Sequence, residues 1–289
     1  PSLHGKLSGR ITIDGGRKLY VQCRGIGTPM VILEAGLRVR SDYWSFNNAK
    51  PPTTSVLPGV AKFTRVCTYD RPGTVIGPGI RQRSRSDPVR MPRSAMSAVE
   101  DLHRLAEAAH FARPFVLAGH STGGLIIRMY AHRFPRNVAG MVLIEALPDG
   151  LDRHLTPTQY ATFLRLNTEK QKGLESYKGY ETIPFEPAFA ELRRLEVRMP
   201  LRPMPLAVLS RGLPVTLPTK SIPKGFSQAL EGAWRAQQRS LVKLEPGAHQ
   251  IIAARSEHYI MLEQPNLIIR AIRDIVDAVR KNPTRPRSR

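Results

Sequence analysis

The chain has 289 residues, which suits one large α/β domain or two small ones and allows a sizeable core without a metal or a dense disulfide network. Its 41% hydrophobic and 23% charged residues are typical of an ordinary globular protein. No apolar run approaches the roughly 20 residues that a membrane-spanning helix needs.

The chain is strongly basic. Lysine and arginine number 44 against 23 acidic residues, which gives a net charge of +21. This balance favours loose electrostatic association with an anionic envelope or membrane surface. The basic residues are scattered, without zinc-finger spacing or an RNA-binding aromatic signature, so we expect a solvated basic surface and no specific nucleic-acid partner. Local density occurs only at Arg81, Arg83, Arg85, Arg90 and Arg93 and in the tail at Arg285, Arg287 and Arg289.

The first part of the chain predicts strands. Residues 10–24 fit two short strands joined at Asp14-Gly15-Gly16, a hairpin turn signal. The continuous apolar runs at 30–34 and 64–69 suit buried parallel strands. Residues 74–93 are rich in Gly, Pro, Arg and Ser, and we expect them to form an exposed loop.

Helices then alternate with strands. A helix is predicted for 94–110, because Ala98, Leu102, Leu105 and Ala109 are spaced for one face. The later elements follow as strand 115–118, helix 125–133, strand 138–144, helical stretches near 156–175 and 186–199, strand 206–209, helix 225–241, strand 249–253 and helix 266–281.

This alternation predicts a mostly parallel sheet with helices on both faces. We expect the core domain to comprise residues 1–146 and 205–282. Residues 147–204, inserted after the sixth strand, would form a helical cap, and residues 283–289 a flexible basic tail.

The pattern Gly119-His120-Ser121-Thr122-Gly123 stands between a predicted strand and a predicted helix. Such a corner is so tight that bulky side chains at the glycine positions would clash. It raises the serine hydroxyl above the sheet at a helix N-terminus, where developing negative charge is favoured. Ser121 is therefore the predicted nucleophile.

With these residues the sequence resembles the α/β-hydrolase family over nearly its whole length. The resemblance is closest to secreted actinobacterial members, in stretches such as LYVQCRGIGTPMVILEAGL, RVCTYDRPG and SEHYIMLEQPNLI. It implies an eight-stranded sheet in which only the second strand is antiparallel.

The resemblance also implies the oxyanion hole. One donor would be the backbone N–H of Thr122, after the nucleophile, and the other that of Leu37, after the glycine that ends the third strand. Many relatives carry His-Gly where this chain has Ala35-Gly36, a departure that should matter little because the donors are backbone groups.

Eight histidines compete for the role of general base. His120 lies inside the corner and is expected to point the wrong way, while His103, His110 and His132 belong to predicted helices. His249 begins a strand. His258 stands after the last short strand, where the family places its base on a loop that returns over the serine, and is our choice.

Most relatives carry the triad acid after the seventh strand, but here that strand leads into Arg211-Gly212 without a carboxylate. The sixth strand ends in Glu145, a position used by certain haloalkane dehalogenases and zearalenone lactonases. Glu145 is therefore the predicted acid, orienting the imidazole and stabilising its cation. Asp149 is the reserve candidate.

A serine nucleophile predicts attack on an acyl carbonyl and hydrolysis of the acyl-enzyme. A small-molecule or lipid-like carboxylic ester is the expected substrate. A lactone or an amide is the enzymatic alternative, and a non-catalytic binding protein on the same scaffold the other. We expect Tyr43, Trp44, Leu147 and Tyr259 to line the pocket, and Leu151, Phe163 and Phe185 to join Leu147 in an apolar roof. Nothing in the sequence indicates a metal or an organic cofactor.

The only two cysteines, Cys23 and Cys67, fall on strands that are neighbours in the family sheet. The resemblance therefore implies a disulfide and, with it, an oxidising compartment. Because the chain starts at Pro1 without an apolar leader, we expect a mature or trimmed product that is secreted or held in the cell envelope.

Overall fold

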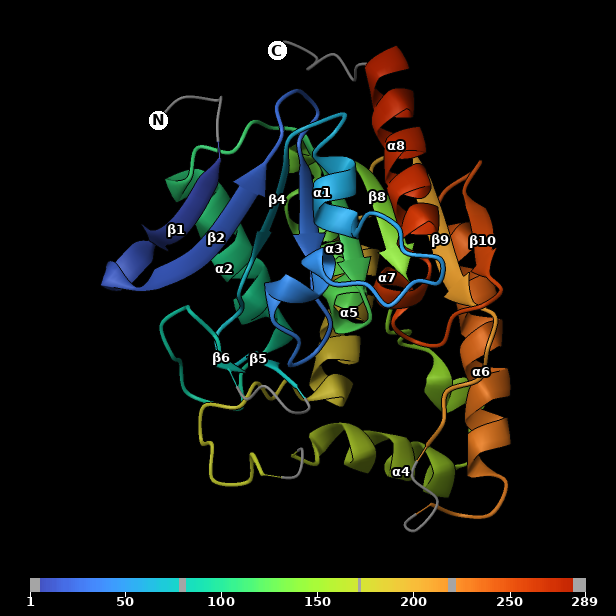
Figure 1. The fold of residues 1–289 in the computed structure, drawn as a ribbon. Helices are drawn as coiled ribbons and strands as arrows, with labels where there is room; N and C mark the ends of the chain where they lie inside the picture. The colour runs from blue at the N-terminus through green and yellow to red at the C-terminus, as the bar shows by residue number, and fades with distance from the viewer. Residues whose placement is uncertain (1–5, 78–81, 171–172, 218–221, 283–289) are drawn as a thin grey trace.

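A computed structural model describes residues 6–77, 82–170, 173–217 and 222–282 (Figure 1). Its main sheet has eight strands, in the order β1-β2-β4-β3-β7-β8-β9-β10. In that order they are Leu7–Thr12, Lys18–Arg24, Val66–Tyr69, Val31–Glu34, Phe115–His120, Val138–Ile144, Leu206–Arg211 and His249–Ala253. Only β2 runs antiparallel to its neighbours, as expected.

The strands are apolar throughout because both faces of the sheet are covered by helices. In β3, Ile32 packs into one hydrophobic cluster and Val31 and Leu33 into another, on opposite faces. The first cluster includes residues of α2 (Ala95–Ala108), α3 (Thr122–Arg133), α5 (Phe185–Arg198) and α6 (Phe226–Leu241). The second includes residues of α1 (Val56–Val60), α7 (Ile260–Glu263) and α8 (Pro265–Lys281). The predicted layered α/β architecture is thus confirmed.

Residues 147–204 include α4 (Pro157–Thr168) and α5. Helix α4 begins at a capping box made by Thr156 and Gln159, and lies apart from the sheet (Figure 1). Helix α5 instead packs against α2 and α3 and buries Phe189 and Leu192 in the first cluster. The division into core and cap stays a prediction, and the tail predicted at 283–289 lies outside the described residues.

The expectation of an exposed loop at 74–93 is wrong in part: Val75 and Ile76 are buried, although Gln82, Arg83 and Arg90 are exposed. Strands β5 (Val75–Ile76) and β6 (Gln82–Arg83) pair there, and Arg93 is buried. Arg85 hydrogen-bonds the buried carboxylate of Asp70 at 2.7 Å. Arginine side chains can be buried when carboxylates compensate their charge. The amino-acid composition of the segment does not reveal such pairs.

Two further features concern a disulfide and the capacity of the helices to span a membrane. Cys23 faces Cys67 across β2 and β4, and the two form the expected disulfide. Within the described ranges, none of the helices combines the length and the apolar character needed to cross a bilayer.

Candidate active site

Ser121 stands at the corner between β7 and α3 with φ 53° and ψ −122°. A positive φ is strained for a residue with a side chain, so the surrounding packing must hold this backbone. A Cβ on Gly119 would lie 2.6 Å from the carbonyl oxygen of Gly123, and one on Gly123 would collide with the carbonyl oxygen of Glu34. The two glycines are therefore required by the corner, as the sequence predicts.

Ser121 and His258 line the same two cavities, with volumes of about 230 and 450 Å³. Leu37, Arg38 and Asn167 also line both. The serine and the histidine, 137 positions apart in the sequence, are thus brought together at the junction of the two cavities.

The carboxylate of Glu145 lies behind His258. Its Oε2 is 3.4 Å from Nδ1 of His258 and accepts a hydrogen bond of 3.0 Å from Nε1 of Trp234. Glu145 follows β8 with a φ of 44° and is completely buried. Because Nδ1 faces the carboxylate, Nε2 is the imidazole nitrogen left to interact with the hydroxyl or a substrate.

Arg211, at the end of β9, makes two contacts with Glu145. Its backbone N–H donates to Oε1 at 2.8 Å, and its guanidinium donates to Oε2. Burial by itself would raise the pKa of Glu145, but the hydrogen bond to His258 and the charge of Arg211 outweigh it and lower that pKa. Glu145 is therefore ionised at neutral pH.

His120 contacts the backbone and the ring of His258. Its Nε2–H donates to the backbone oxygen of His258 at 2.8 Å, and the two rings are 4.7 Å apart. Burial, helped by the nearby His258, lowers the pKa of His120 to about 3, so the ring is neutral. That His120 does not serve as the base stays a prediction, and its hydrogen bond to the His258 backbone was not foreseen.

Leu37 and Thr122 line the larger cavity together with Ser121. Among the described residues, the N–H groups of Leu37 and Thr122 have no hydrogen-bond acceptor. A Cβ on Gly36 would lie 2.8 Å from Nδ1 of His120 and 3.3 Å from Cβ of Ser121, so the loop passes close to the nucleophile. Backbone N–H groups without an acceptor are the kind of donor that an oxyanion hole uses.

A buried ion cluster holds the Leu37 loop. Arg71 donates to the carbonyl oxygens of Ala35 at 2.7 Å and Gly36 at 2.6 Å, and pairs with the carboxylates of Glu34 and Glu181. Glu181 also accepts the backbone N–H of Arg38 at 2.6 Å. Because the two carbonyls before Leu37 are bound to Arg71 and the N–H after it is bound to Glu181, the loop is held on both sides of Leu37. The sequence analysis did not predict this cluster. The one local signal was the Asp70-Arg71-Pro72 turn after β4, which contains Arg71.

The competing candidates lie elsewhere. His103 stacks on Phe134 with ring centroids 3.7 Å apart, and His249 begins the edge strand β10. Asp149 forms an ion pair with Arg128 at 3.0 Å. None of the three lines either cavity at Ser121.

The predicted lining residues fall into two groups. Tyr43 and Tyr259 line the smaller cavity, and Leu147, Phe163 and Phe185 line the larger one. The expectation for Trp44 is wrong, because its side chain is fully buried in the hydrophobic cluster beneath α1 and α8. Leu151 is likewise buried in the core and does not contribute to the roof.

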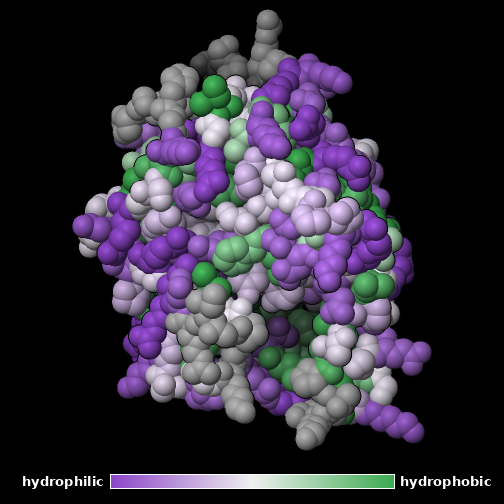
Figure 2. Space-filling model, viewed as in Figure 1, coloured by the Kyte–Doolittle hydropathy of each residue, from purple (hydrophilic) through white to green (hydrophobic). Residues whose placement is uncertain are grey.

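The two cavities differ in chemistry. The larger one is mainly apolar and adds residues of α6 that the sequence did not single out, Leu230 and Trp234. Figure 2 shows a hollow with hydrophobic side chains in the lower part of the molecule, where α4 and α6 lie in Figure 1. The smaller cavity presents Arg38, Tyr43 and Asn167, together with the backbone of Gly77.

The described residues were also searched for a set of metal ligands. No group of three or more His, Cys, Asp or Glu residues there is arranged to hold an ion.

Comparison with known proteins identifies the family and the fold. The sequence pattern of the Alpha/beta hydrolase family matches residues 30–274. The uncharacterized protein YqjL of Bacillus subtilis is 26% identical over 264 residues, covering 91% of this chain and 90% of its own. A putative lipase from Acinetobacter baumannii is similar in structure, with a TM-score of 0.61, 20% identity and coverage of 96% and 93%. Est816, described as an N-acyl homoserine lactone degrading enzyme, gives a TM-score of 0.59 with 17% identity and coverage of 93% and 100%.

Proposed function

Because the chain belongs to the α/β-hydrolase family, we propose that it hydrolyses carboxylic esters through an acyl-enzyme on Ser121, with His258 as general base and Glu145 as the orienting acid. One observation carries the proposal. A nucleophile at a strained corner shares its cavities with a histidine whose Nδ1 is 3.4 Å from a buried carboxylate. A Ser-His-acid triad is recognised by the geometry of its three residues and by the role of each, and not by their positions in the sequence.

The reaction follows from these positions. Nε2 of His258 accepts the hydroxyl proton as Ser121 Oγ attacks the acyl carbon. The N–H groups of Leu37 and Thr122 stabilise the oxyanion. Collapse of the intermediate breaks the C–O bond, and the imidazolium returns its proton to the departing alcohol. Water activated by the same histidine then releases the acid and regenerates the serine. Glu145 stays ionised throughout and balances the imidazolium.

The contrast between the cavities supports an amphiphilic ester as substrate. The larger apolar cavity accommodates an alkyl or aryl group, and the smaller polar one accommodates a compact hydrogen-bonding group. A lactone follows the same steps without releasing a separate alcohol. An amide would demand stronger protonation of its leaving group, so we place it after esters and lactones.

A fluorophosphonate probe tests the proposal. Wild type should be labelled and should hydrolyse short aryl esters, whereas Ser121→Ala should do neither while keeping its melting temperature. A folded wild type that is neither labelled nor active would favour a binding protein on a hydrolase scaffold. A panel of matched esters, lactones and anilides would then rank the substrate classes.

We also propose that the protein works in an oxidising compartment, secreted or held in the envelope, as the resemblance to secreted actinobacterial members implies. The Cys23–Cys67 disulfide supports this. By the chain-entropy estimate it contributes roughly 4 kcal/mol to stability. Thiol titration of the denatured, unreduced protein from its native source should find no free thiols, and two would contradict the proposal.

A further inference from the structure

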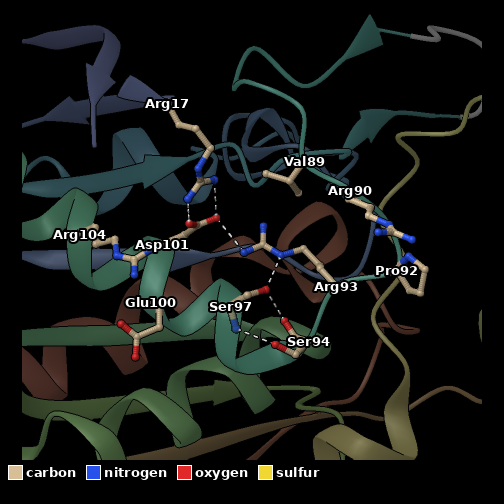
Figure 3. Close-up of a pocket in the computed structure, with 10 residues that line it drawn as sticks. All are labelled: Arg17, Val89, Arg90, Pro92, Arg93, Ser94, Ser97, Glu100, Asp101 and Arg104. Carbon is tan, nitrogen blue, oxygen red and sulfur yellow. Dashed lines mark hydrogen bonds and ion pairs between the residues drawn. The ribbon is translucent and has the colours of Figure 1, made fainter. Parts of the chain in front are cut away.

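A third cavity, of about 390 Å³, lies at the start of α2 and shares no lining residue with those at Ser121. Four arginines line it: Arg17 from the β1–β2 hairpin, Arg90 and Arg93 from the segment before α2, and Arg104 from α2 (Figure 3). Two of them, Arg90 and Arg93, belong to the run of basic residues noted in the sequence, to which the hydrolase chemistry gives no role.

The cavity is built around one buried carboxylate. Asp101 pairs with Arg17 at 2.5 Å and with Arg93 at 2.7 Å, so a single acidic residue fixes two guanidinium groups. Glu100 is the other acidic residue of the lining, which leaves an excess of two positive charges. Arg104 also pairs with Asp14, outside the lining, at 2.9 Å. The cavity is therefore basic and its central arginines are preorganised.

Donors remain unused in this cavity. Arg93 is nearly fully buried, with 5% of its side chain exposed, and its Nη1 has no hydrogen-bond partner. In Figure 3 this nitrogen points away from Asp101, toward the space between Arg17 and Val89. Arg90 has no partner among the described residues. Because Nη1 of Arg93 is itself buried, the exposed guanidinium of Arg90 is the unpaired donor that a ligand in the cavity can reach without a rearrangement.

The N-terminus of α2 adds to the attraction for an anion. The Ser94 hydroxyl accepts the backbone N–H of Ser97 at 3.1 Å, which leaves the hydroxyl proton of Ser94 free to donate. The positive end of this 14-residue helix thus faces the same lining residues. Planar guanidinium groups match the oxygens of a phosphate better than those of a spherical halide.

We propose that this cavity binds a phosphate group carried on a small polar molecule, either a soluble phosphate ester or the headgroup of an anionic lipid. The volume exceeds what one phosphate fills, and Val89 and Pro92 supply apolar wall for the carrier. The site is independent of the hydrolase chemistry proposed above.

Calorimetric titration of the full chain with glycerol phosphate at constant ionic strength tests the site. We expect saturable binding that is roughly tenfold weaker in Arg90→Gln. Arg270→Gln is the matched control: it removes the same charge from an exposed position on α8 and should leave binding unchanged. Arg93→Lys should weaken binding as well, with its melting temperature checked because Arg93 is paired with Asp101.

Vesicles identify the source of the phosphate. If phosphatidylglycerol vesicles bind more tightly than phosphatidylcholine vesicles and glycerol phosphate displaces them, the ligand is a lipid headgroup. If Arg90→Gln weakens glycerol phosphate binding but not vesicle binding, the ligand is soluble. Equal losses in Arg90→Gln and Arg270→Gln, or no binding of glycerol phosphate by folded wild type, would overturn the proposal.

Discussion

Arg211 donates its backbone N–H and a guanidinium N–H to the carboxylate of Glu145, so the residue at the end of β9 holds the carboxylate at the end of β8. The resemblance places the acid of most relatives where Arg211 stands. On the proposed assignment the acid instead follows the preceding strand, β8, and a cation stands at the end of β9. Glu231 of α6 accepts another guanidinium N–H of Arg211 at 2.6 Å and compensates its charge.

This arrangement predicts opposite pH effects from the two partners. Arg211→Met removes a positive charge near the imidazole, so protonation of His258 becomes easier and the acidic limb of kcat/KM should move to higher pH. Glu231→Gln removes a negative charge that partly offsets Arg211 and should move the same limb to lower pH. Each displacement is expected to be roughly one pH unit, measured from pH profiles with a neutral ester.

If the Arg211–Glu231 pair had a purely structural role, both variants would lose activity, but the acidic limb of kcat/KM would stay at the same pH in each. The other groups that face the imidazole stay in place in both variants: Glu145, His120, Trp234 and Tyr259. Displacements in the same direction would contradict the electrostatic account. Melting temperatures would identify any variant that has lost its fold.

Glu145→Gln should lower kcat by roughly 10²–10⁴-fold with little change in KM, because the amide can neither balance the imidazolium nor hold the same tautomer. Asp149→Asn is the control, since Asp149 contacts Arg128 and not the base. Its activity should stay within a few-fold of wild type. A large loss in Asp149→Asn with an active Glu145→Gln would reassign the acid.

The features that the sequence predicts well are those with local causes. The corner at Ser121 requires glycines for steric reasons, and strands covered on both faces must be apolar, so both could be expected from short stretches. The position of His258 depended on the family resemblance, because only the fold brings it to Ser121.

Other features depend on partners far away in the chain. Arg71 is buried because Glu181, 110 positions later, supplies a carboxylate. Trp44 is buried because its segment packs against α1 and α7, which its own stretch of sequence does not indicate. A side chain's neighbours across the sheet leave no signature in its own segment. The sequence therefore predicts the corner at Ser121, while the contacts of His120, Arg71 and Arg211 required coordinates.

The buried neutral His120 predicts a pH-dependent stability. Its pKa is about 3 in the folded protein against an ordinary value of 6.5, so the unfolded chain binds the proton first as the pH falls. Stability should therefore drop between pH 6.5 and 3, by about 1.4 kcal/mol per pH unit from this group alone. His120→Gln keeps a donor for the His258 carbonyl and should remove this part of the pH dependence. Urea denaturation of both proteins across the range would measure it, and parallel curves would refute it.

Leu230 provides a test of the larger cavity as the site for the apolar part of the substrate. It lines that cavity from α6 but does not line the smaller one. In Leu230→Trp the added indole should fill space needed by long acyl chains, lowering kcat/KM for them by roughly tenfold while short acyl esters are spared. Leu230→Met conserves volume and should keep the wild-type profile. If Leu230→Trp instead reduces all chain lengths equally, the acyl chain does not enter this cavity, because steric exclusion at a distant wall can act only on substrates long enough to reach it.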